Sequence, residues 1–527
     1  MSKFWDQLKS LNSSPEGRRW IFVPYDQLSA EIGPLADEAP EKLGIVLVEN
    51  LWKPKQRPYH KQKIGYILGN MRHFALEQAG RGVAVRYVFG DAPYSELLAP
   101  VIEELGPLEM MEAAERELRK DLEGLEGLTI LPHQGWLTRE EHFENSQNKL
   151  KTWRMDSFYR HVRQETEILM ENGKPIGGRY SLDGDNRKPW KGEPELPEPP
   201  TFPDDPIKSE VGELIKKLFS HHPGKLDLSR LPTTYQDAQD LWGWAKQQCM
   251  EHFGTYEDAM TVVSSGLFHT RLSPLMNLHR ILPKQVLDEV LELDIPLNSK
   301  EGFVRQLIGW REFMRHVHRE TDGFRNLPDA KTETDGGATP NFLEGQVDLP
   351  AAFWEETKSG LFCLDQVVEE VWNEGYSHHI TRLMVLSNLG TLWGVKPRQL
   401  TDWFWVAYID AFDWVVEPNV LGMGMFALGE LFTTKPYVSG SAYIDKMSDY
   451  CKECQFHPKK TCPITHYYWA FVDRNAERLK DNQRMRMMLR NVAKRSEEKK
   501  ERDQWVLKTS LEALGKGQEL SPKLLED

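Results

Sequence analysis

The chain is 527 residues long, which is enough for about two to four domains, and 40% of its residues are apolar. Its formal net charge of −14 argues against indiscriminate coating of nucleic acid. The most apolar stretch, 403–416, is interrupted by two aspartates, so we expect no membrane segment. Because it has only five cysteines and a polar, amphipathic start, we expect a cytoplasmic protein without disulfides.

The first part of the chain alternates short apolar runs with a long helical pattern. We expect strands at 20–23, 44–48, 83–89 and 128–131, and a helix at 61–77. This rhythm is typical of a doubly wound parallel α/β sheet, assigned here to residues 1–150. Asp26 and Gln27 follow the first strand and Glu49 follows the second, where such sheets bind ligands, although these residues could equally cap a helix. No GxGxxG fingerprint accompanies them.

Seven prolines between Lys188 and Pro206 predict a linker, and we assign residues 151–230 to an interdomain segment. The pattern of residues 231–527 predicts a large all-α domain. Helices are expected at 235–253, 283–293, 302–318, 361–374, 378–392, 398–411 and 473–514. The loop 326–348 is expected to be exposed and mobile because it is rich in Gly, Asp and Thr.

Four cysteines predict a metal or cluster site. Cys451, Cys454 and Cys462 lie close together, and Cys363 lies far upstream. Soft thiolates at this spacing suit zinc or an iron–sulfur cluster, and inert buried thiols are a third possibility. His457 could complete a Cys3His zinc site without Cys363, so spacing alone favours zinc.

The segment FHTRLSPLMN can be interpreted as a phosphate site. Thr270, Leu272 and Ser273, with a proline at the start of a helix, could hold a diphosphate against the helix dipole. The hydroxyl of Tyr256 could add a donor. Taken alone, the segment is better explained as an ordinary helix cap.

Several long segments together give a more specific indication. They are DQLS, HKQKI, MRHF, FHTRLSPLMN, GFVRQLIGWREF, EGYSHHITRLMVLSN, YIDAFDWVVEPNVLGM, KPYVSGSAYIDKMSDYCKEC and the later TCP. With them the chain resembles the photolyase and cryptochrome family, specifically its bacterial iron–sulfur branch, whose studied members repair the (6-4) photoproduct in DNA. The chain departs from that branch at His316 and His318.

The resemblance implies three cofactors. FAD would lie in the helical domain against Tyr256, Thr270, Leu272, Ser273, Asn277, Gln306, Arg311, Asp410 and Asp413, with Glu417 or Asn419 near the flavin N5 atom. For Arg311 and Asp410 a helix salt bridge is the alternative. A [4Fe-4S] cluster would be bound by Cys363, Cys451, Cys454 and Cys462, which replaces zinc as the preferred reading and leaves His457 in a loop. A 6,7-dimethyl-8-ribityllumazine antenna would sit in the sheet domain near Asp26, Gln27 and Glu49.

The resemblance also implies catalytic and electron-transfer residues. His379 matches the histidine that donates a proton to the lesion, and only one of His378 and His379 is expected to face the pocket, because neighbouring helical side chains point about 100° apart. Tyr437 is expected to face the lesion. The expected electron-transfer residues are Trp403, Trp354 and Tyr443. Asp183 would lie near the lesion with a divalent cation such as Mg²⁺, or would be a turn carboxylate.

These indications predict a monomeric, light-dependent enzyme that repairs (6-4) photoproducts in UV-damaged DNA with reduced FAD. The flipped-out lesion would enter the pocket, since its reactive bonds lie inside the stacked duplex. The alternative is a cryptochrome-type blue-light photoreceptor with the same fold and cofactors. A flavin-free scaffold is disfavoured, because FHTRLSPLMN and the Asp410 loop are intact.

Overall fold

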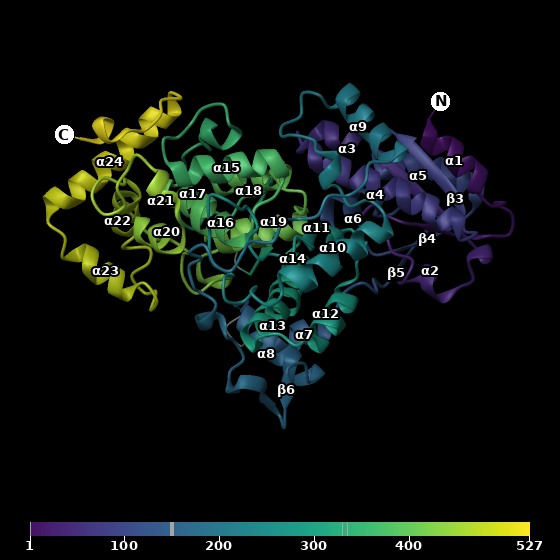
Figure 1. Cartoon of the computed structure of the whole chain (residues 1–527), viewed down its shortest axis with the longest axis horizontal. Helices are drawn as coiled ribbons and strands as arrows, with labels where there is room; N and C mark the ends of the chain where they lie inside the picture. Colours follow the sequence, from purple (N-terminus) through teal and green to yellow (C-terminus); the bar gives the residue numbers. More distant parts are fainter. Residues whose placement is uncertain (1, 148–151, 329, 335, 527) are drawn as a thin grey trace.

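The computed structural model describes residues 2–147, 152–328, 330–334 and 336–526. The sheet domain lies at one end of the molecule and the last helices at the other, with the remaining helices between them (Figure 1). Within the described residues, no helix is long and apolar enough to cross a bilayer.

The amino-terminal sheet has five parallel strands in the order β3-β2-β1-β4-β5. They are β1 (Arg19–Phe22), β2 (Leu43–Asn50), β3 (Ala84–Gly90), β4 (Leu108–Met111) and β5 (Leu128–Leu131). The strand order reverses beside β1, which confirms the predicted doubly wound sheet. β4 was not predicted, because its four residues include a glutamate and show no extended apolar run.

Helices cover this sheet and connect it to the rest of the chain. They are α1 (Lys3–Leu11), α2 (Pro34–Asp37), α3 (Trp52–Gln56), α4 (Lys61–Gly80), α5 (Tyr94–Leu105) and α6 (Arg116–Leu122). Most of α4 is buried, because α1 and α9 (Pro206–Leu218) also pack on it. The predicted linker 151–230 therefore contains a helix that belongs spatially to the sheet domain. Its proline-rich part, 188–205, has no regular structure.

The predicted linker also contributes to the helical half. Within it, α8 (Met155–Thr166) packs against η5 (Arg305–Glu312) and on α7 (Glu140–Ser146), which precedes the predicted linker. The short pair β6 (Met170–Glu171) and β7 (Lys174–Pro175) follows. The domain boundaries at 150 and 230 stay predictions.

The remainder is helical, as predicted. The elements that line the site or connect to it are α10 (Tyr235–Gln248), α11 (Ser273–Asn277), α12 (Pro283–Glu292), α13 (Leu297–Val304), η5, α14 (Phe313–Glu320), η6 (Ala351–Trp354), α15 (Phe362–Glu374), α16 (His379–Thr381), η7 (Arg382–Ser387), α17 (Asn388–Trp393), α18 (Pro397–Ala407), α19 (Asp413–Val416) and η8 (Glu417–Gly424). The last ones are α20 (Ser441–Met447), α21 (Tyr450–Glu453), α22 (Ile464–Arg474), α23 (Arg486–Ala493) and α24 (Glu497–Gly515).

The expected helices 235–253 and 398–411 end earlier, at Gln248 and Ala407. Two further segments also differ. The expected single helix 473–514 is divided among the end of α22, α23 and α24, because turns occupy 475–485. The loop 326–348 contains two short antiparallel pairs, β8 (Asn326–Leu327) with β9 (Ala330–Lys331) and β10 (Glu333–Thr334) with β11 (Gly337–Ala338).

Candidate functional site

A cavity of about 300 Å³ lies among the helices of the second half. Its volume is at the lower end of the range typical of ligand sites. Ten of the predicted site residues line it: Thr270, Leu272, Ser273, Asn277, Gln306, Arg311, His378, His379, Asp410 and Asn419. Residues that are up to about 150 positions apart in the chain therefore meet at one place.

Three π-helical segments form part of this cavity wall. Gln306 and Arg311 lie on η5, Arg382 lies on η7, and Asn419 lies on η8. A π-helical turn shifts the side chains that follow it relative to an α-helix, and such turns are frequent at functional sites. Their coincidence around one cavity supports a binding role for it.

Asp410 is the centre of a polar network at the cavity wall. Arg382 donates to both of its carboxylate oxygens at 2.9 and 3.1 Å, and the Ser273 hydroxyl donates at 2.6 Å. Asn277 donates to the Asp410 carbonyl at 2.9 Å. Burial alone would raise the pKa of Asp410, but Arg382 and Ser273 hold it below its ordinary value. The cavity thus contains a fixed carboxylate that stays ionised.

Arg311 presents a guanidinium with unused hydrogen-bonding capacity. It lies over the ring of Trp136 at 4.4 Å, and it donates to Glu312. Its Nε atom has no partner among the described residues. Burial lowers the pKa of Arg311 to about 10, although the adjacent Glu312 opposes the shift. Arg311 can therefore form both the salt bridge, to Glu312, and the predicted contact with FAD, since one side of its guanidinium group remains available.

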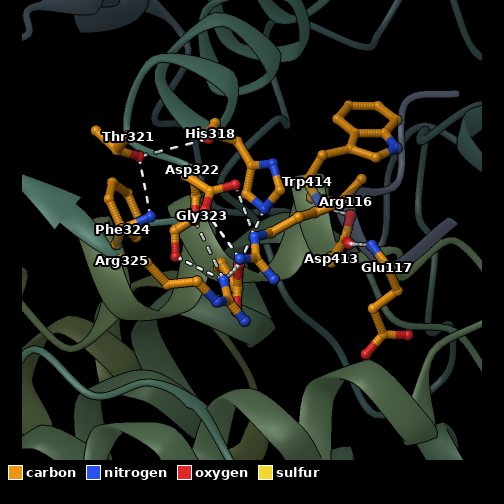
Figure 2. Close-up of polar contacts among 12 residues, drawn as sticks. Arg116, Glu117, His318, Thr321, Asp322, Gly323, Phe324, Arg325, Asp413 and Trp414 are labelled. Atoms are coloured by element: carbon orange, nitrogen blue, oxygen red, sulfur yellow. Dashed lines mark hydrogen bonds and ion pairs between the residues drawn. The ribbon is translucent and has the colours of Figure 1, made fainter. Parts of the chain in front are cut away.

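Three residues predicted for the FAD site do not line the cavity. Tyr256 donates its hydroxyl to the Glu193 carbonyl at 3.2 Å. Asp413 accepts a hydrogen bond from the backbone of Glu117, which connects α6 to α19 (Figure 2). Glu417 is fully buried beside His318 at 2.9 Å. Of the two candidates for the flavin N5 position, only Asn419 faces the cavity.

The environment of Glu417 explains its position. Besides His318 it pairs with Arg325 at 3.3 Å and Arg398 at 2.8 Å. Burial alone would raise the pKa of Glu417. His318 and the two arginines outweigh this effect and lower the pKa to about 2. Glu417 is therefore a permanently ionised structural group, and His318, which departs from the related branch, is one of its partners.

Both His378 and His379 line the cavity, which corrects the expectation that only one could do so. His378 is the N-cap residue of α16 and has an extended backbone, φ −75° and ψ 169°. The angle of about 100° between neighbouring helical side chains therefore does not apply to His378 and His379. His378 is 2% exposed and stacks on His269 at 4.6 Å, whereas the side chain of His379 is 42% exposed. Burial, together with the neighbouring imidazoles, lowers the pKa of His269 and His378.

His269 was not predicted from the sequence, although it lies inside the segment FHTRLSPLMN. The ring nitrogens of His269, His378 and His379 lie within 4.8 Å of one another. The rings of His269 and His378 are nearly parallel, at 12°, so their in-plane lone pairs do not converge on one point. The arrangement suits a stack of neutral imidazoles better than a metal chelate.

The cavity mouth carries a second network, centred on Asp258. Its carboxylate lies 3.5 Å from His379 Nε2, accepts from the Tyr443 hydroxyl at 3.3 Å and lies 3.7 Å from Arg187. Arg187 and Arg305 also pair with Asp183. Because two guanidinium groups already neutralise it, Asp183 is a poor ligand for Mg²⁺. Tyr437 is half-buried, and burial raises its pKa.

An aromatic chain leads away from the cavity. Tyr408 lines the cavity and lies 6.0 Å from Trp403. Trp403 lies 5.8 Å from Trp372, which stacks on Trp354 at 5.7 Å. Trp354 is half-buried, so the chain approaches the surface. Trp372, on α15, joins the two predicted tryptophans and was not identified from the sequence.

The four predicted cysteines lie around one small apolar cavity near the C-terminus. Cys363 begins α15, Cys451 lies on α21, and Cys454 and Cys462 flank the following loop. Burial, and then the nearby cysteines, raise the pKa of Cys363. His457 lies outside this cavity and accepts a hydrogen bond from the backbone of Lys459 at 3.2 Å. The geometry therefore fits a four-thiolate site better than a Cys3His site.

Two of the three predicted antenna residues, Gln27 and Glu49, form hydrogen bonds within the protein. Glu49 accepts from Arg72 at 2.8 and 2.9 Å and from Tyr87 at 2.6 Å. Gln27 donates to the carbonyls of Met111 and Glu112 at 3.1 Å. Asp26 is buried, and among the described residues neither of its carboxylate oxygens has a hydrogen-bond partner.

The cavity nearest these strand ends has a volume of only about 60 Å³. Lys53 and Lys63 reach into it, and Lys63 donates to the Trp405 carbonyl at 2.8 Å. The volume is well below the range typical of small-molecule sites. None of Asp26, Gln27 and Glu49 lines it, so these residues do not fit a ribityllumazine site.

Comparisons with known proteins agree with this architecture. The family described as "Deoxyribodipyrimidine photo-lyase-related protein" matches residues 21–231. A "(6-4) photolyase" of Agrobacterium fabrum is 33% identical over 499 residues, which are 91% of this chain and 96% of that protein. The "Uncharacterized protein R855" of Acanthamoeba polyphaga mimivirus is 40% identical over 70 residues, 13% of this chain and 57% of that protein.

Two solved structures share the fold. The crystal structure of a bacterial class III photolyase from Agrobacterium tumefaciens has a TM-score of 0.51 at 14% identity and covers 96% of this chain and 99% of its own. The structure of the Synechocystis sp. PCC6803 cryptochrome has a TM-score of 0.50 at 15% identity and covers 77% of this chain and 82% of its own.

Proposed function

The chain belongs to the photolyase and cryptochrome family, and we propose that it repairs pyrimidine (6-4) pyrimidone photoproducts in DNA in a light-dependent reaction. The observation that carries the proposal is the convergence of ten predicted site residues on one cavity, beside a solvent-exposed histidine at its mouth. The (6-4) photolyase of Agrobacterium fabrum, which aligns over nearly the whole chain, supports this choice of lesion.

The cavity residues fit FAD, the cofactor that the family implies. Reduced FAD absorbs light and supplies the electron that starts repair. Ser273, Asn277, Arg382 and Asp410 form a preorganised polar wall, and Arg311 offers an unpaired donor for an anionic part of the cofactor. Asn419 supplies a further polar group to the cavity wall, on η8. These residues bind and orient the cofactor, and the apolar remainder of the cavity excludes water.

His379 acts as the proton donor to the lesion. It lies at the mouth of the cavity, where its Nε2 atom is 3.5 Å from the Asp258 carboxylate and its side chain is accessible to a bound lesion. His378 and His269 remain neutral because burial lowers their pKa values, so they do not repel the imidazolium. In the proposed repair, the lesion takes up one electron and a proton from His379, and the hydroxyl on C5 of the 5′ base moves back to C4 of the 3′ base as the C6–C4 bond between the bases breaks. The electron and the proton are then returned, so the repaired bases are an isomer of the lesion and His379 regains its proton.

Two further parts of the chain support redox chemistry at the cavity. The aromatic chain Tyr408, Trp403, Trp372 and Trp354 offers a path for electrons from the surface when the oxidised cofactor is reduced. Tyr443 donates to Asp258 in the network at the cavity mouth, and Tyr437 is the proposed lesion-facing tyrosine. Cys363, Cys451, Cys454 and Cys462 bind a [4Fe-4S] cluster that clamps α15 to the C-terminal region.

A cryptochrome-type photoreceptor is the second candidate, because the fold is shared with a cryptochrome at nearly the same TM-score. The accessible His379 favours repair, since a receptor that does not bind DNA lesions has no need of an exposed proton donor at this position.

Illumination of the purified, reduced protein with an oligonucleotide that carries one (6-4) lesion separates the two candidates. We expect restoration of the original bases in the light and none in the dark. Flavin bands without any repair would favour the photoreceptor, and a protein without flavin would contradict both candidates.

A further inference from the structure

A cationic surface on α23 is not used by the proposed chemistry. Arg484, Arg486, Arg490 and Lys494 are exposed, and none of them forms an ion pair among the described residues. They occur within 11 residues that contain no acidic side chain, in a chain whose net charge is −14. An uncompensated positive stripe on an acidic protein indicates an anionic partner.

The packing of α23 fixes which side faces solvent. Met485 and Val492 are buried and Met488 and Leu489 are partly buried against the neighbouring core, which includes α22. The opposite side presents the cations, together with Met487, which is 68% exposed. The helix therefore cannot rotate to hide its charges without losing its apolar contacts.

The spacing of these cations suits a phosphate backbone. Arg486, Arg490 and Lys494 are separated by four residues each, so they lie along one side of the helix over about 12 Å. One strand of duplex DNA carries a phosphate about every 3.4 Å along its axis, so the stripe matches roughly three to four phosphates.

The stripe is connected to the segment that carries Tyr437. Asn482, just before α23, donates to the Thr434 carbonyl at 3.0 Å. The exposed Lys435 follows, and then Tyr437, a predicted lesion-facing residue. In Figure 1, α23 and α20 lie at the same end of the molecule, far from the sheet domain.

We propose that α23 binds the sugar-phosphate backbone of duplex DNA that flanks the nucleotide at the cavity mouth. The position beside the lesion rests on the proposed function, whereas affinity for undamaged duplex does not. An anionic membrane is a poorer partner, because the apolar side of α23 is packed against the protein and only Met487 could enter lipid.

The test is the salt dependence of binding to undamaged duplex DNA by the full chain with Arg486→Gln, Arg490→Gln and Lys494→Gln combined. Each lost phosphate contact lowers the slope of log K against log salt by about 0.9, so we expect a decrease of about 2.7. At 0.1 M salt the affinity should fall on the order of 100-fold. Repair turnover at saturating lesion DNA should be unchanged.

The matched control removes three cations from the sheet domain, Lys9→Gln, Lys216→Gln and Lys217→Gln, and should leave the slope unchanged. A triple Arg486→Lys, Arg490→Lys and Lys494→Arg variant keeps the charges and should bind like wild type. An unchanged slope in the α23 Gln variant would overturn the inference, as would loss of binding to phosphatidylserine vesicles without loss of DNA binding. A wild-type protein that binds duplex through α23 but repairs nothing would contradict the proposed function alone.

Discussion

His378 and His379 are neighbours in the chain but differ in every property that decides proton transfer. His378 is 2% exposed and stacked on His269, so its charged form is disfavoured by burial. His379 is 42% exposed and has a carboxylate 3.5 Å away. The difference arises because the helix begins between them, with His378 in an extended conformation.

Replacement of His379 by alanine should lower repair of a (6-4) lesion by about 100-fold or more while FAD stays bound, because general acid catalysis is lost. The measurement is single-turnover repair after a light flash, with flavin absorbance as the binding readout. The control, His457→Ala, removes a histidine outside the cavity and should repair normally. Undiminished repair by the His379 variant would show that the proton has another source.

The pKa of Asp26 predicts how the stability of the fold depends on pH. Its carboxylate is buried, and burial raises its pKa to about 7. The folded state therefore retains a proton that the unfolded chain loses near pH 4, so this residue increasingly destabilises the fold as pH rises from about 4 to 7.

Asp26→Asn should remove that dependence. The stability of the variant relative to wild type should be about 3 kcal/mol more favourable at pH 8 than at pH 5, since two pKa units separate pH 5 from the folded pKa. Urea unfolding at the two pH values measures the difference. Equal effects at both values would mean that Asp26 is ionised throughout.

The helix α15 connects two parts of the redox machinery. Cys363 begins it, and Trp372 lies two turns later in the aromatic chain between Trp403 and Trp354. The Nε1 atoms of Trp372 and Trp403 both donate to the Phe353 carbonyl at 2.9 Å, which fixes the two rings at right angles. One helix thus positions both a cluster ligand and an electron carrier.

Trp372→Phe should slow light-driven reduction of the oxidised flavin, because phenylalanine fills most of the space but is much harder to oxidise. Repair by protein that has already been reduced chemically should be unaffected. Trp242→Phe, a buried tryptophan on α10 outside the aromatic chain, is the control. Equal photoreduction rates in the wild type, the Trp372→Phe variant and the Trp242→Phe variant would exclude electron transfer through Trp372.

The residues that line the cysteine cavity predict which side chains bind the metal. Cys363→Ser should lose most of the bound iron, because a thiolate from α15 is removed from the site. His457→Ala should keep the iron content of wild type, because this side chain lies outside the cavity. Iron analysis of both variants decides between four-thiolate and Cys3His coordination, and the opposite pattern would favour the latter.

The sheet domain and the helical half are joined by charged contacts that no local sequence pattern predicts. Arg116 of α6 pairs with Asp322 after α14 at 2.7 Å, and the next backbone N–H, that of Glu117, reaches Asp413 on α19 (Figure 2). These contacts bring residues more than 200 positions apart together. They explain why Asp413, predicted to contact FAD, instead holds the sheet domain against the helical half.

Much of this architecture could be predicted from sequence because it depends on local periodicity and long motifs. Four strands and the principal helices follow from periodicity, whereas the cavity residues Asn277, Arg311 and Asp410 follow from the resemblance of the long motifs to a known family. His269, Asp258 and Trp372 were missed, because their roles come from neighbours distant in the chain. The positions of Glu417 and Glu49 could not be predicted either, since each is decided by arginines on other elements.

The cofactors bound to the whole chain test this interpretation most directly. Protein purified without oxygen should release FAD on denaturation, in an amount close to that of the chain, and should contain iron and inorganic sulfide rather than zinc. Colourless protein that neither contains nor binds FAD would contradict the assignment of the cavity, and zinc without iron would contradict that of the four cysteines.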